Sequence, residues 1–340
     1  MPPEARILGL GAELPERELA NRELAQVLGE GGDAIAQRTG VGRRFQAAPG
    51  EGPSALALRA AQRALSEART EVSELGLIIF ATTTPDICFP GAACLLQHKL
   101  GAPTVGAMDV RAQSAGFLCA LDLAVAYATT PVAPGAAGAD PRYARVLVAA
   151  GEVMSSGLDM SPSGSDLTPR FGDGAAAAIV GPGEHGPRVR ALRWYTDGTR
   201  VEQFWCEYPA SRQYPHRVTR EDLRAGKHFP RADLAALAGL VRERLAETSR
   251  QVLSDCGLAA RELDAALVDY VVPSVARDVA ADVGVEGSRV GVPTADFGHV
   301  LAGGLAIGLE QRRAGLARGA RVLLAAAGPG LSWGAAVLEF

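Results

Sequence analysis

Ser114 lies at the junction of a predicted strand and a predicted helix. It follows a short apolar run at residues 105–110, typical of a strand, and directly precedes an apolar segment at residues 115–128 with the composition of a helix. The N-terminal end of a helix offers free N–H groups and a positive dipole end, which stabilise an anion or a tetrahedral oxyanion. A serine hydroxyl needs an adjacent base to react. A catalytic role for Ser114 would therefore require a base from elsewhere in the sequence.

Other reactive side chains lack the spacing of a known site. The cysteines form no CxxC pair and no cluster with histidines at zinc-binding spacing, so we expect reduced, buried thiols and no metal site. They are Cys88, Cys94, Cys119, Cys206 and Cys256. The glycine-rich strings at residues 29–32 and 328–331 lack the spacing and the lysine of a phosphate-binding loop.

The charge and hydropathy of the chain exclude some function classes. A formal net charge of −4 argues against nucleic acid as the main ligand, although a local basic patch for a phosphate-bearing cofactor or an acidic carrier protein stays possible. No apolar run reaches the roughly 18 residues of a membrane span. The first residues lack the pattern of a signal peptide. We therefore expect a cytoplasmic protein that binds neither membrane nor nucleic acid.

Strand-like apolar runs alternate with helical segments, which predicts α/β layers. The predicted strands are residues 6–10, 75–81, 105–110, 145–150, 175–180, 265–272, 322–327 and 335–340. The predicted helices are residues 54–68, 92–100, 115–128, 233–256, 279–283 and 303–315. Two halves with a similar rhythm suggest a duplicated unit. Residues 181–230 have weak periodicity and indicate a connector with an insertion, and residues 129–141 indicate an exposed loop.

Five stretches, in order along nearly the whole chain, resemble the β-ketoacyl-ACP synthase III family of the thiolase superfamily. They are RTGVGRR (38–44), ATTTPDICFPGAAC (81–94), DVRAQSAGF (109–117), FGDGAAAAIV (171–180) and GPGLSWGAAVLEF (328–340). The resemblance implies a five-layered αβαβα thiolase fold with two pseudo-duplicated halves. Residues 1–182 would carry the nucleophile, and residues 183–340 would carry the base and the closing glycine-rich loop.

The resemblance also assigns roles to individual positions. The family's catalytic cysteine corresponds to Ser114. Its histidine, which follows a strand and a proline, corresponds to Ser274 in YVVPSVARD, and its asparagine corresponds to His299 in TADFGHVLAGG. The backbone N–H groups of Ser114 and Gly330 match the family's oxyanion hole. All three catalytic side chains therefore differ from those of the family.

Two interpretations of these changes stay open. In the first, His299 is the base for Ser114, and Ser274 is a hydrogen-bonding neighbour; Ser–His is an established nucleophile–base pair. In the second, the site is inactive and the chain is the non-catalytic partner of an active synthase. Asp296, three residues before His299, could orient the imidazole, but a loop cap or a solvent-facing acid is the simpler expectation.

The changed residues favour acyl transfer over decarboxylative condensation. Condensation needs two side-chain donors for the enolate, and here one is replaced by serine while the other acts as a base. We expect a Ser-linked acyl-enzyme that takes its acyl group from an acyl-ACP or acyl-CoA and passes it to a carrier thiol, hydroxyl or amine in a specialised, polyketide-like pathway. A starter-unit ketosynthase and a hydrolase are the alternatives.

The donor and the assembly are also implied by the resemblance. No cofactor is permanently bound, and the acyl donor carries a phosphopantetheine arm. Arg38 and Arg277 are the candidate contacts for it, whereas Ala34 replaces the tryptophan that often stacks on the adenine of CoA, which favours a carrier protein. Phe89 matches a residue that reaches across a dimer interface into the partner's tunnel, so we expect a homodimer.

The remaining histidines and one acid have simpler explanations. His228 lies in the insertion and could line a substrate tunnel, but a surface position is the simpler expectation. Asp173 in FGDGA is expected to be a structural turn residue. His98, His185 and His216 are expected at the surface or in loops.

Overall fold

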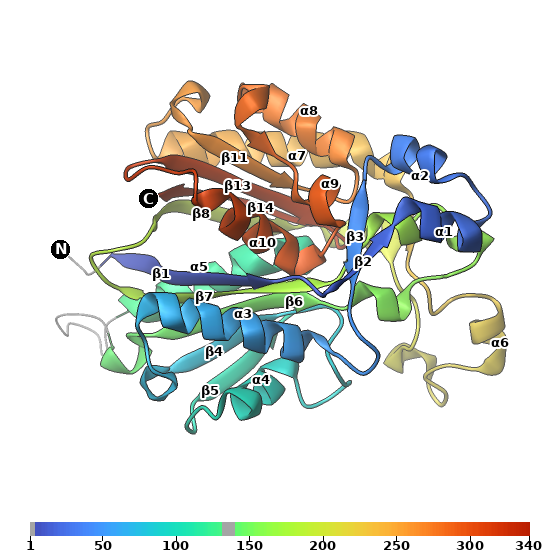
Figure 1. Ribbon diagram of the computed structural model, residues 1–340, viewed down its shortest axis with the longest axis horizontal. Coiled ribbons are helices and arrows are strands. Elements are labelled where there is room, and N and C mark those ends of the chain that lie inside the picture. Colours follow the sequence, from blue (N-terminus) through green and yellow to red (C-terminus); the bar gives the residue numbers. More distant parts are fainter. Residues whose placement is uncertain (1–3, 131–139) are drawn as a thin grey trace.

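A computed structural model describes residues 4–130 and 140–340 of the chain. Ten strands form one mixed sheet, in the order β12-β11-β13-β14-β8-β1-β7-β6-β4-β5 (Figure 1). The N-terminal five are β1 (Ala5–Glu13), β4 (Leu77–Ala81), β5 (Gly106–Val110), β6 (Val146–Glu152) and β7 (Gly174–Pro182). The C-terminal five are β8 (Arg188–Thr196), β11 (Ala265–Asp269), β12 (Val290–Gly291), β13 (Arg321–Gly328) and β14 (Ser332–Glu339).

The two sets of five strands have the same topology. Number the strands of each set from first to fifth along the chain. In both sets the spatial order, from the outer edge to the middle of the sheet, is then third, second, fourth, fifth and first. In both, the second strand is parallel to the third and fourth, and the fifth is antiparallel to the fourth and first. The sets meet where β1 and β8 pair at Arg6 and Arg188. A division of the chain at residue 182 stays a prediction.

Helices cover the strands in three layers, which gives the expected αβαβα arrangement. The buried residues of α5 (Gly116–Thr129) and α10 (Leu301–Arg313) form one core with the facing sides of both strand sets. Outside the N-terminal set lie α3 (Pro53–Ala68) and α4 (Ala92–Leu100). Outside the C-terminal set lie α7 (Leu234–Asp255) and α8 (Pro273–Val283) (Figure 1).

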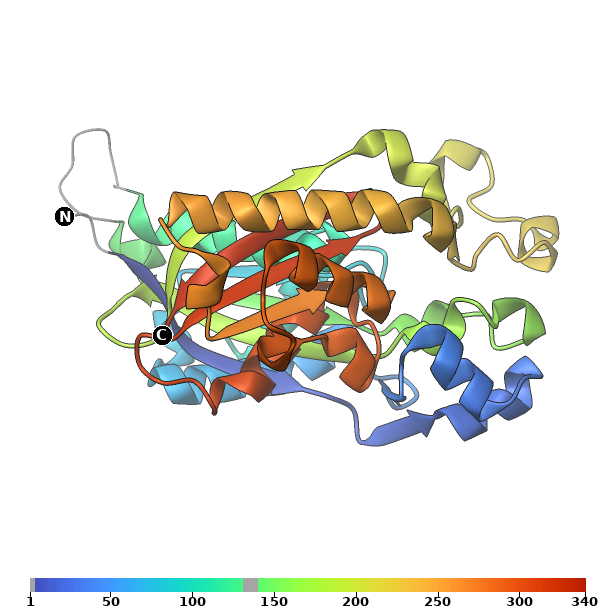
Figure 2. The ribbon, with the colours of Figure 1, turned by 90° about the horizontal axis from the view of Figure 1, so that it is seen from above.

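Shorter elements gather at one end of the molecule, on the right in Figures 1 and 2. They include α1 (Asn21–Leu28), α2 (Gly32–Thr39) and α6 (Arg220–Arg224). Two small two-stranded sheets pair β2 (Arg17–Ala20) with β3 (Arg43–Gln46), and β9 (Phe204–Trp205) with β10 (Arg231–Ala232). The short helix α9 (Pro293–Phe297) precedes α10.

Two expectations for individual elements were wrong. Residues 188–196, assigned to the connector, form β8, which pairs with β14 along its whole length. Most of its side chains are partly or fully exposed, so the strand lacks the apolar signal of a buried one. Helix α8 begins at Pro273 rather than at residue 279, because proline is well suited to the first turn of a helix. Most of the predicted loop at residues 129–141 lies outside the described residues.

Candidate active site

Ser114 lies in a 3-10 turn (Gln113–Ala115) between β5 and α5, and its side chain is completely buried. The preceding Gln113 has a φ of 47°, a left-handed conformation that is uncommon for a residue other than glycine. A buried hydroxyl needs a hydrogen-bond partner. The partner of Ser114 Oγ is Nε2 of His299, 2.9 Å away. The structure therefore brings together the expected nucleophile and base from two segments 185 residues apart.

The backbone of His299 is held by the N-terminal half of the chain. Its N–H donates to the carbonyl of Arg170 at 2.7 Å, and its carbonyl accepts from the N–H of Gly172 at 3.3 Å. The imidazole is fully buried, and its ring centroid lies 5.8 Å from that of Phe171. Because both main chain and ring are packed, the direction of the imidazole toward Ser114 is fixed.

The second imidazole nitrogen faces a hydroxyl and a carboxylate. Nδ1 of His299 lies 2.9 Å from Oγ1 of Thr294, and that hydroxyl lies 2.5 Å from Oδ1 of Asp269. Nδ1 lies 3.5 Å from the same Asp269 oxygen, which is beyond the usual length of an N–H···O bond. Both side chains are completely buried. Ser114 and His299 thus continue into Thr294 and Asp269 as one hydrogen-bonded chain.

Parallel pairing of β11 with β12 explains why these residues meet. Asp269 is the last residue of β11, and Thr294 follows β12 in the first turn of α9. The carboxyl ends of parallel strands lie at the same edge of a sheet, so both side chains reach the same place. Gly304 leaves the room they need, since a Cβ there would lie 2.4 Å from Oδ2 of Asp269.

The turn between β13 and β14 packs against Ser114. A Cβ at Gly328 would lie 2.3 Å from Ser114 Oγ, so the hydroxyl fits only because this residue is glycine. Pro329 has no N–H to offer. Gly330 lies further along the turn, with a φ of 134° that favours glycine. The oxyanion-hole role of the Gly330 and Ser114 N–H groups stays a prediction.

Within the described residues, Ser274 makes no hydrogen bond to Ser114 or His299. It lies in the first turn of α8 and is exposed, whereas Ser114 and His299 are completely buried. The early start of α8 explains its position, because the helix turns Val275 and Ala276 into the core and leaves Ser274 outside. Thr294 and Asp269, rather than Ser274, are the polar neighbours of His299. A strand-end acid next to a parallel strand was the available sequence signal for Asp269.

The other predicted contacts lie on the surface. Arg38 is already engaged, with Glu30, with Asp166 at 3.4 Å and with the carbonyl of Ser165 at 2.8 Å. Arg277 is exposed on α8. Phe89 is 80% exposed in the loop before α4. The roles of these three residues in donor binding and dimer contact stay predictions.

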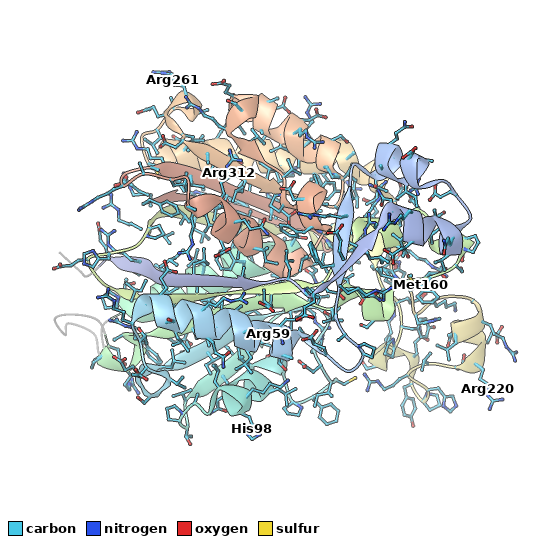
Figure 3. The ribbon with its side chains drawn as sticks, viewed as in Figure 1. Arg59, His98, Met160, Arg220, Arg261 and Arg312 are labelled. Atoms are coloured by element: carbon cyan, nitrogen blue, oxygen red, sulfur yellow. The ribbon has the colours of Figure 1, made fainter. Side chains whose placement is uncertain are left out.

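Asp296 does not orient His299. Its side chain is exposed, and its backbone carbonyl accepts from Nε of Arg43 at 3.2 Å. His228 is half-buried and stacks on Phe229, with ring centroids 3.9 Å apart. Three other histidines are exposed, as expected, and one of them projects from α4 in Figure 3. They are His98, His185 and His216.

Arg44, in the RTGVGRR stretch, is a buried cation that was not singled out from the sequence. Burial lowers its pKa to about 10. Its guanidinium donates to the carbonyls of Leu19 and Pro169, and its Cβ would be 2.8 Å from a Cβ at Gly298. Arg44 therefore contacts both Pro169, next to Arg170, and Gly298, next to His299. It supports the backbone that carries the base.

Asp173 and the cysteines also have defined places. The Asp173 carboxylate accepts from the backbone N–H groups of Ala47 and Ser155, both at a distance below 3 Å, and so ties three segments together. The expectation of buried thiols was wrong for three of five cysteines: Cys119 is buried, Cys256 is half-buried, and the others are exposed. The exposed ones are Cys88, Cys94 and Cys206.

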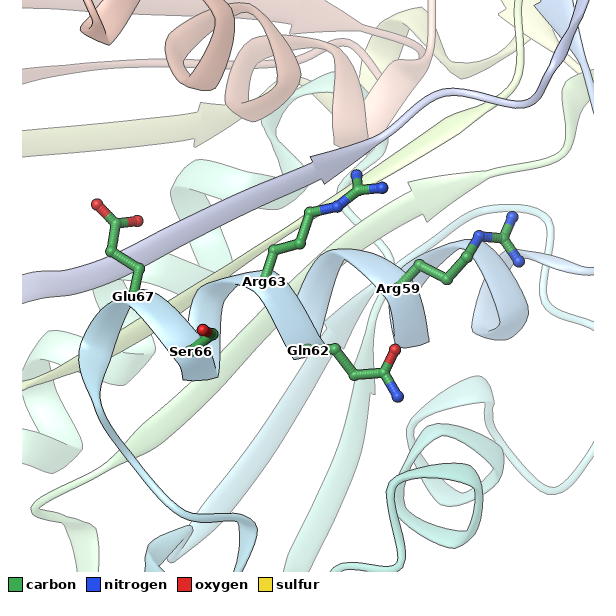
Figure 4. Close-up of a pocket in the computed structure, with 5 residues that line it drawn as sticks. All are labelled: Arg59, Gln62, Arg63, Ser66 and Glu67. Carbon is green, nitrogen blue, oxygen red and sulfur yellow. The ribbon is translucent and has the colours of Figure 1, made fainter.

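A shallow depression on the outer side of α3 lies apart from the buried site. It is lined by Arg59, Gln62, Arg63, Ser66 and Glu67 (Figure 4). Its arginines pair with Glu13, and Arg59 also with Glu51, so the depression is a network of surface ion pairs.

Within residues 4–130 and 140–340, no helix is long and apolar enough to cross a membrane. The same residues contain no group of acids, histidines and cysteines suited to hold a metal ion.

Comparisons with known proteins identify the family. Residues 108–198 match the family model of 3-oxoacyl-(acyl-carrier-protein) synthase III, and residues 253–340 match the model of its C-terminal part. The β-ketoacyl-(acyl-carrier-protein) synthase III of Syntrophomonas wolfei is 31% identical over 339 residues, which are 99% of this chain and 98% of the relative.

Solved structures show the same fold. The 3-oxoacyl-(acyl carrier protein) synthase III of Pseudomonas aeruginosa is 28% identical, with a TM-score of 0.85 over 99% of this chain and 98% of the other. The priming β-ketosynthase of the R1128 polyketide pathway is 27% identical, with a TM-score of 0.86 over 100% and 98%. The fold is thus the expected thiolase-like one, and the chain belongs to the β-ketoacyl-ACP synthase III family of acyltransferases.

Proposed function

We propose that this chain is an acyltransferase in which Ser114, in the place of the family's cysteine, forms a covalent acyl-enzyme with His299 as its base. The carrying observation is the 2.9 Å contact between Ser114 Oγ and His299 Nε2 inside a completely buried site. A decayed site has no reason to keep a serine and a histidine at hydrogen-bond distance. This geometry favours an active enzyme over a non-catalytic partner subunit.

The acylation step follows from that contact. Ser114 Oγ attacks the thioester carbonyl while its proton passes to Nε2 of His299. The tetrahedral intermediate collapses, the C–S bond breaks, and the proton on Nε2 goes to the leaving thiolate. An ester on Ser114 and a free thiol result. The acceptor, a carrier thiol, hydroxyl or amine, reverses these steps and takes the acyl group.

The acyl donor carries a phosphopantetheine arm, from an acyl carrier protein or from CoA. Two observations favour the carrier protein. The exposed Ala34 offers no aromatic surface for adenine, and the Arg38 guanidinium already faces the carboxylates of Glu30 and Asp166. A nucleotide phosphate would have to displace those carboxylates, whereas the pantetheine arm of a carrier protein makes no such demand.

Acyl transfer fits the site better than decarboxylative condensation. His299 is the base, and the exposed Ser274 is not hydrogen-bonded to His299 or Ser114, so it is not held ready as a donor to an enolate. The likeness to the R1128 priming ketosynthase supports a place in a specialised, polyketide-like pathway. It also keeps a starter-unit ketosynthase as the second candidate. The free thiols of all five cysteines suit the reducing cytoplasm.

We further propose a homodimer. β5 is the outer strand of the sheet at the N-terminal side, and Phe89, 80% exposed, and Ile87, 46% exposed, lie in the loop that precedes the neighbouring α4. Exposed apolar side chains beside an open strand edge favour association with another chain. Sedimentation analysis should give twice the chain mass, and a monomer at micromolar concentration would contradict the proposal.

The central test is intact-protein mass after mixing the chain with a panel of short acyl-CoAs and acyl carrier proteins. We expect an acyl adduct that is lost in Ser114→Ala and kept in Ser274→Ala, the matched variant of an exposed serine. An adduct that survives Ser114→Ala, or no adduct with any donor, would overturn the proposal and favour a non-catalytic subunit. Efficient carbon–carbon bond formation with malonyl-ACP would instead show the starter-unit ketosynthase.

A further inference from the structure

We propose that Thr294 and Asp269 are positioning residues, which form a hydroxyl relay that keeps His299 ready to accept the Ser114 proton. This inference rests on the proposed serine acyl-enzyme and adds the groups that act through His299. Sequence proximity pointed to Asp296 instead, but that side chain is exposed and lies outside the site.

The direction of each hydrogen bond follows from the chemistry of the groups. An ionised carboxylate only accepts, so the Thr294 hydroxyl must give its single proton to Oδ1 of Asp269, 2.5 Å away. The lone pairs of that hydroxyl are then left to accept from Nδ1–H of His299 at 2.9 Å. A neutral imidazole has one N–H, so Nε2 carries none and accepts from Ser114.

Thr294 is needed because the acid does not reach the imidazole by itself. Asp269 Oδ1 and His299 Nδ1 are 3.5 Å apart, whereas both contacts of the Thr294 hydroxyl have normal hydrogen-bond lengths. Without the Thr294 hydroxyl, both His299 Nδ1 and the Asp269 carboxylate would lose the hydrogen bond described here. The imidazole would then be free to adopt the other tautomer, in which Nε2–H points at Ser114 and cannot act as a base.

Burial gives the relay its second effect. When His299 takes the serine proton it becomes an imidazolium, and the nearest buried charge is the Asp269 carboxylate. Opposite charges attract more strongly away from water than in it. The positive charge that develops during acylation is therefore stabilised by the Asp269 carboxylate. Gly304 leaves the space that this acid occupies, because any Cβ there would collide with Oδ2.

The test compares Thr294→Val, which keeps the shape of the side chain and removes the hydroxyl, with Thr294→Ser, which keeps the hydroxyl. We expect the rate of Ser114 acylation to fall about 10²-fold in Thr294→Val and to stay within about threefold in Thr294→Ser. For Asp269→Asn we expect a loss of about 10²-fold, smaller than the loss on removing His299 itself. Thr294→Val that acylates at the wild-type rate would overturn the relay while leaving the serine acyl-enzyme standing.

A second readout does not depend on activity. Nitrogen NMR of histidine-labelled protein, with His299 assigned through His299→Gln, should show a protonated Nδ1 and an unprotonated Nε2 in the wild type and in Thr294→Ser. Thr294→Val should show a mixture of tautomers. A protonated Nε2 in the neutral wild-type ring would overturn the relay even if Thr294→Val failed to fold. If no donor acylates Ser114 but the expected tautomer is present, the proposed function fails and the relay stands.

Discussion

Ser114 and His299 occupy corresponding places in the two halves of the molecule. Each follows the third strand of its half, and each lies two residues before a helix of the middle layer, α5 for Ser114 and α10 for His299. Both are completely buried. The nucleophile and the base are therefore presented by the same backbone arrangement, used twice.

The surroundings of the two residues differ in polarity. The second strand of the base half, β11, ends at Asp269, whereas the second strand of the nucleophile half, β4, ends at Ala81. Ala81 packs against Gly116 in an apolar contact, while Asp269 begins the polar chain to His299. The acid that ends the second strand of the base half thus joins the network of His299, whereas the matching residue of the nucleophile half is apolar, so the base of Ser114 comes from the other half.

Replacing the base should have the largest effect on the rate of Ser114 acylation. We expect His299→Ala to lower the rate of Ser114 acylation by about 10³-fold, because the serine proton then has no acceptor. The measurement is the rate of adduct formation by intact-protein mass. His228→Ala is the matched control and should acylate like the wild type; equal losses in both variants would contradict the assignment of His299.

A smaller effect is expected from crowding the nucleophile. In Gly328→Ala the new methyl group would lie 2.3 Å from Ser114 Oγ, so the hydroxyl or the turn must move. We expect an acylation rate about 10²-fold lower and a loss of about 1–3 kcal/mol in the free energy of unfolding. Gly239→Ala in α7, where a Cβ meets nothing within 4 Å, is the control for both measurements. Wild-type acylation in Gly328→Ala would show that this turn does not limit the nucleophile.

The smallest effect concerns the thiol one turn beyond the nucleophile. Burial raises the pKa of Cys119 to about 11, and Asp122 adds to the shift, so little thiolate forms at pH 8. We expect iodoacetamide to label Cys88 and Cys94 at least about tenfold faster than Cys119 in the native protein. All should react alike after denaturation. Native labelling of Cys119 at the rate of Cys88 would show that the nucleophile half is open to solvent.

The sequence predicted most of the elements because their residues follow simple periods. Helix α4 was predicted with the bounds that the structure has, and β4 is entirely buried, as a continuous apolar run indicates. The strand β8 was missed, since its alternating arginines and exposed side chains resemble a surface segment.

For the site, the resemblance singled out Ser114 and His299, and the structure places them in contact. It did not reveal Thr294 or Asp269, because their meeting depends on the register of β11 with β12 and not on spacing in the chain. Ser274 was placed at the site by its match to the family's histidine. The outward turn of α8 that exposes it depends on which face of the helix meets the core, and one short segment does not reveal that face.

The backbone of residue 299 is fixed by bonds that do not involve its side chain, to the carbonyl of Arg170 and the N–H of Gly172. Any side chain at this position would start from the same point and enter the same buried space. Evolution could therefore exchange the reactive group here without rebuilding the protein around it. A position of this kind lets one ancestral scaffold diversify in chemistry while its shape is inherited unchanged.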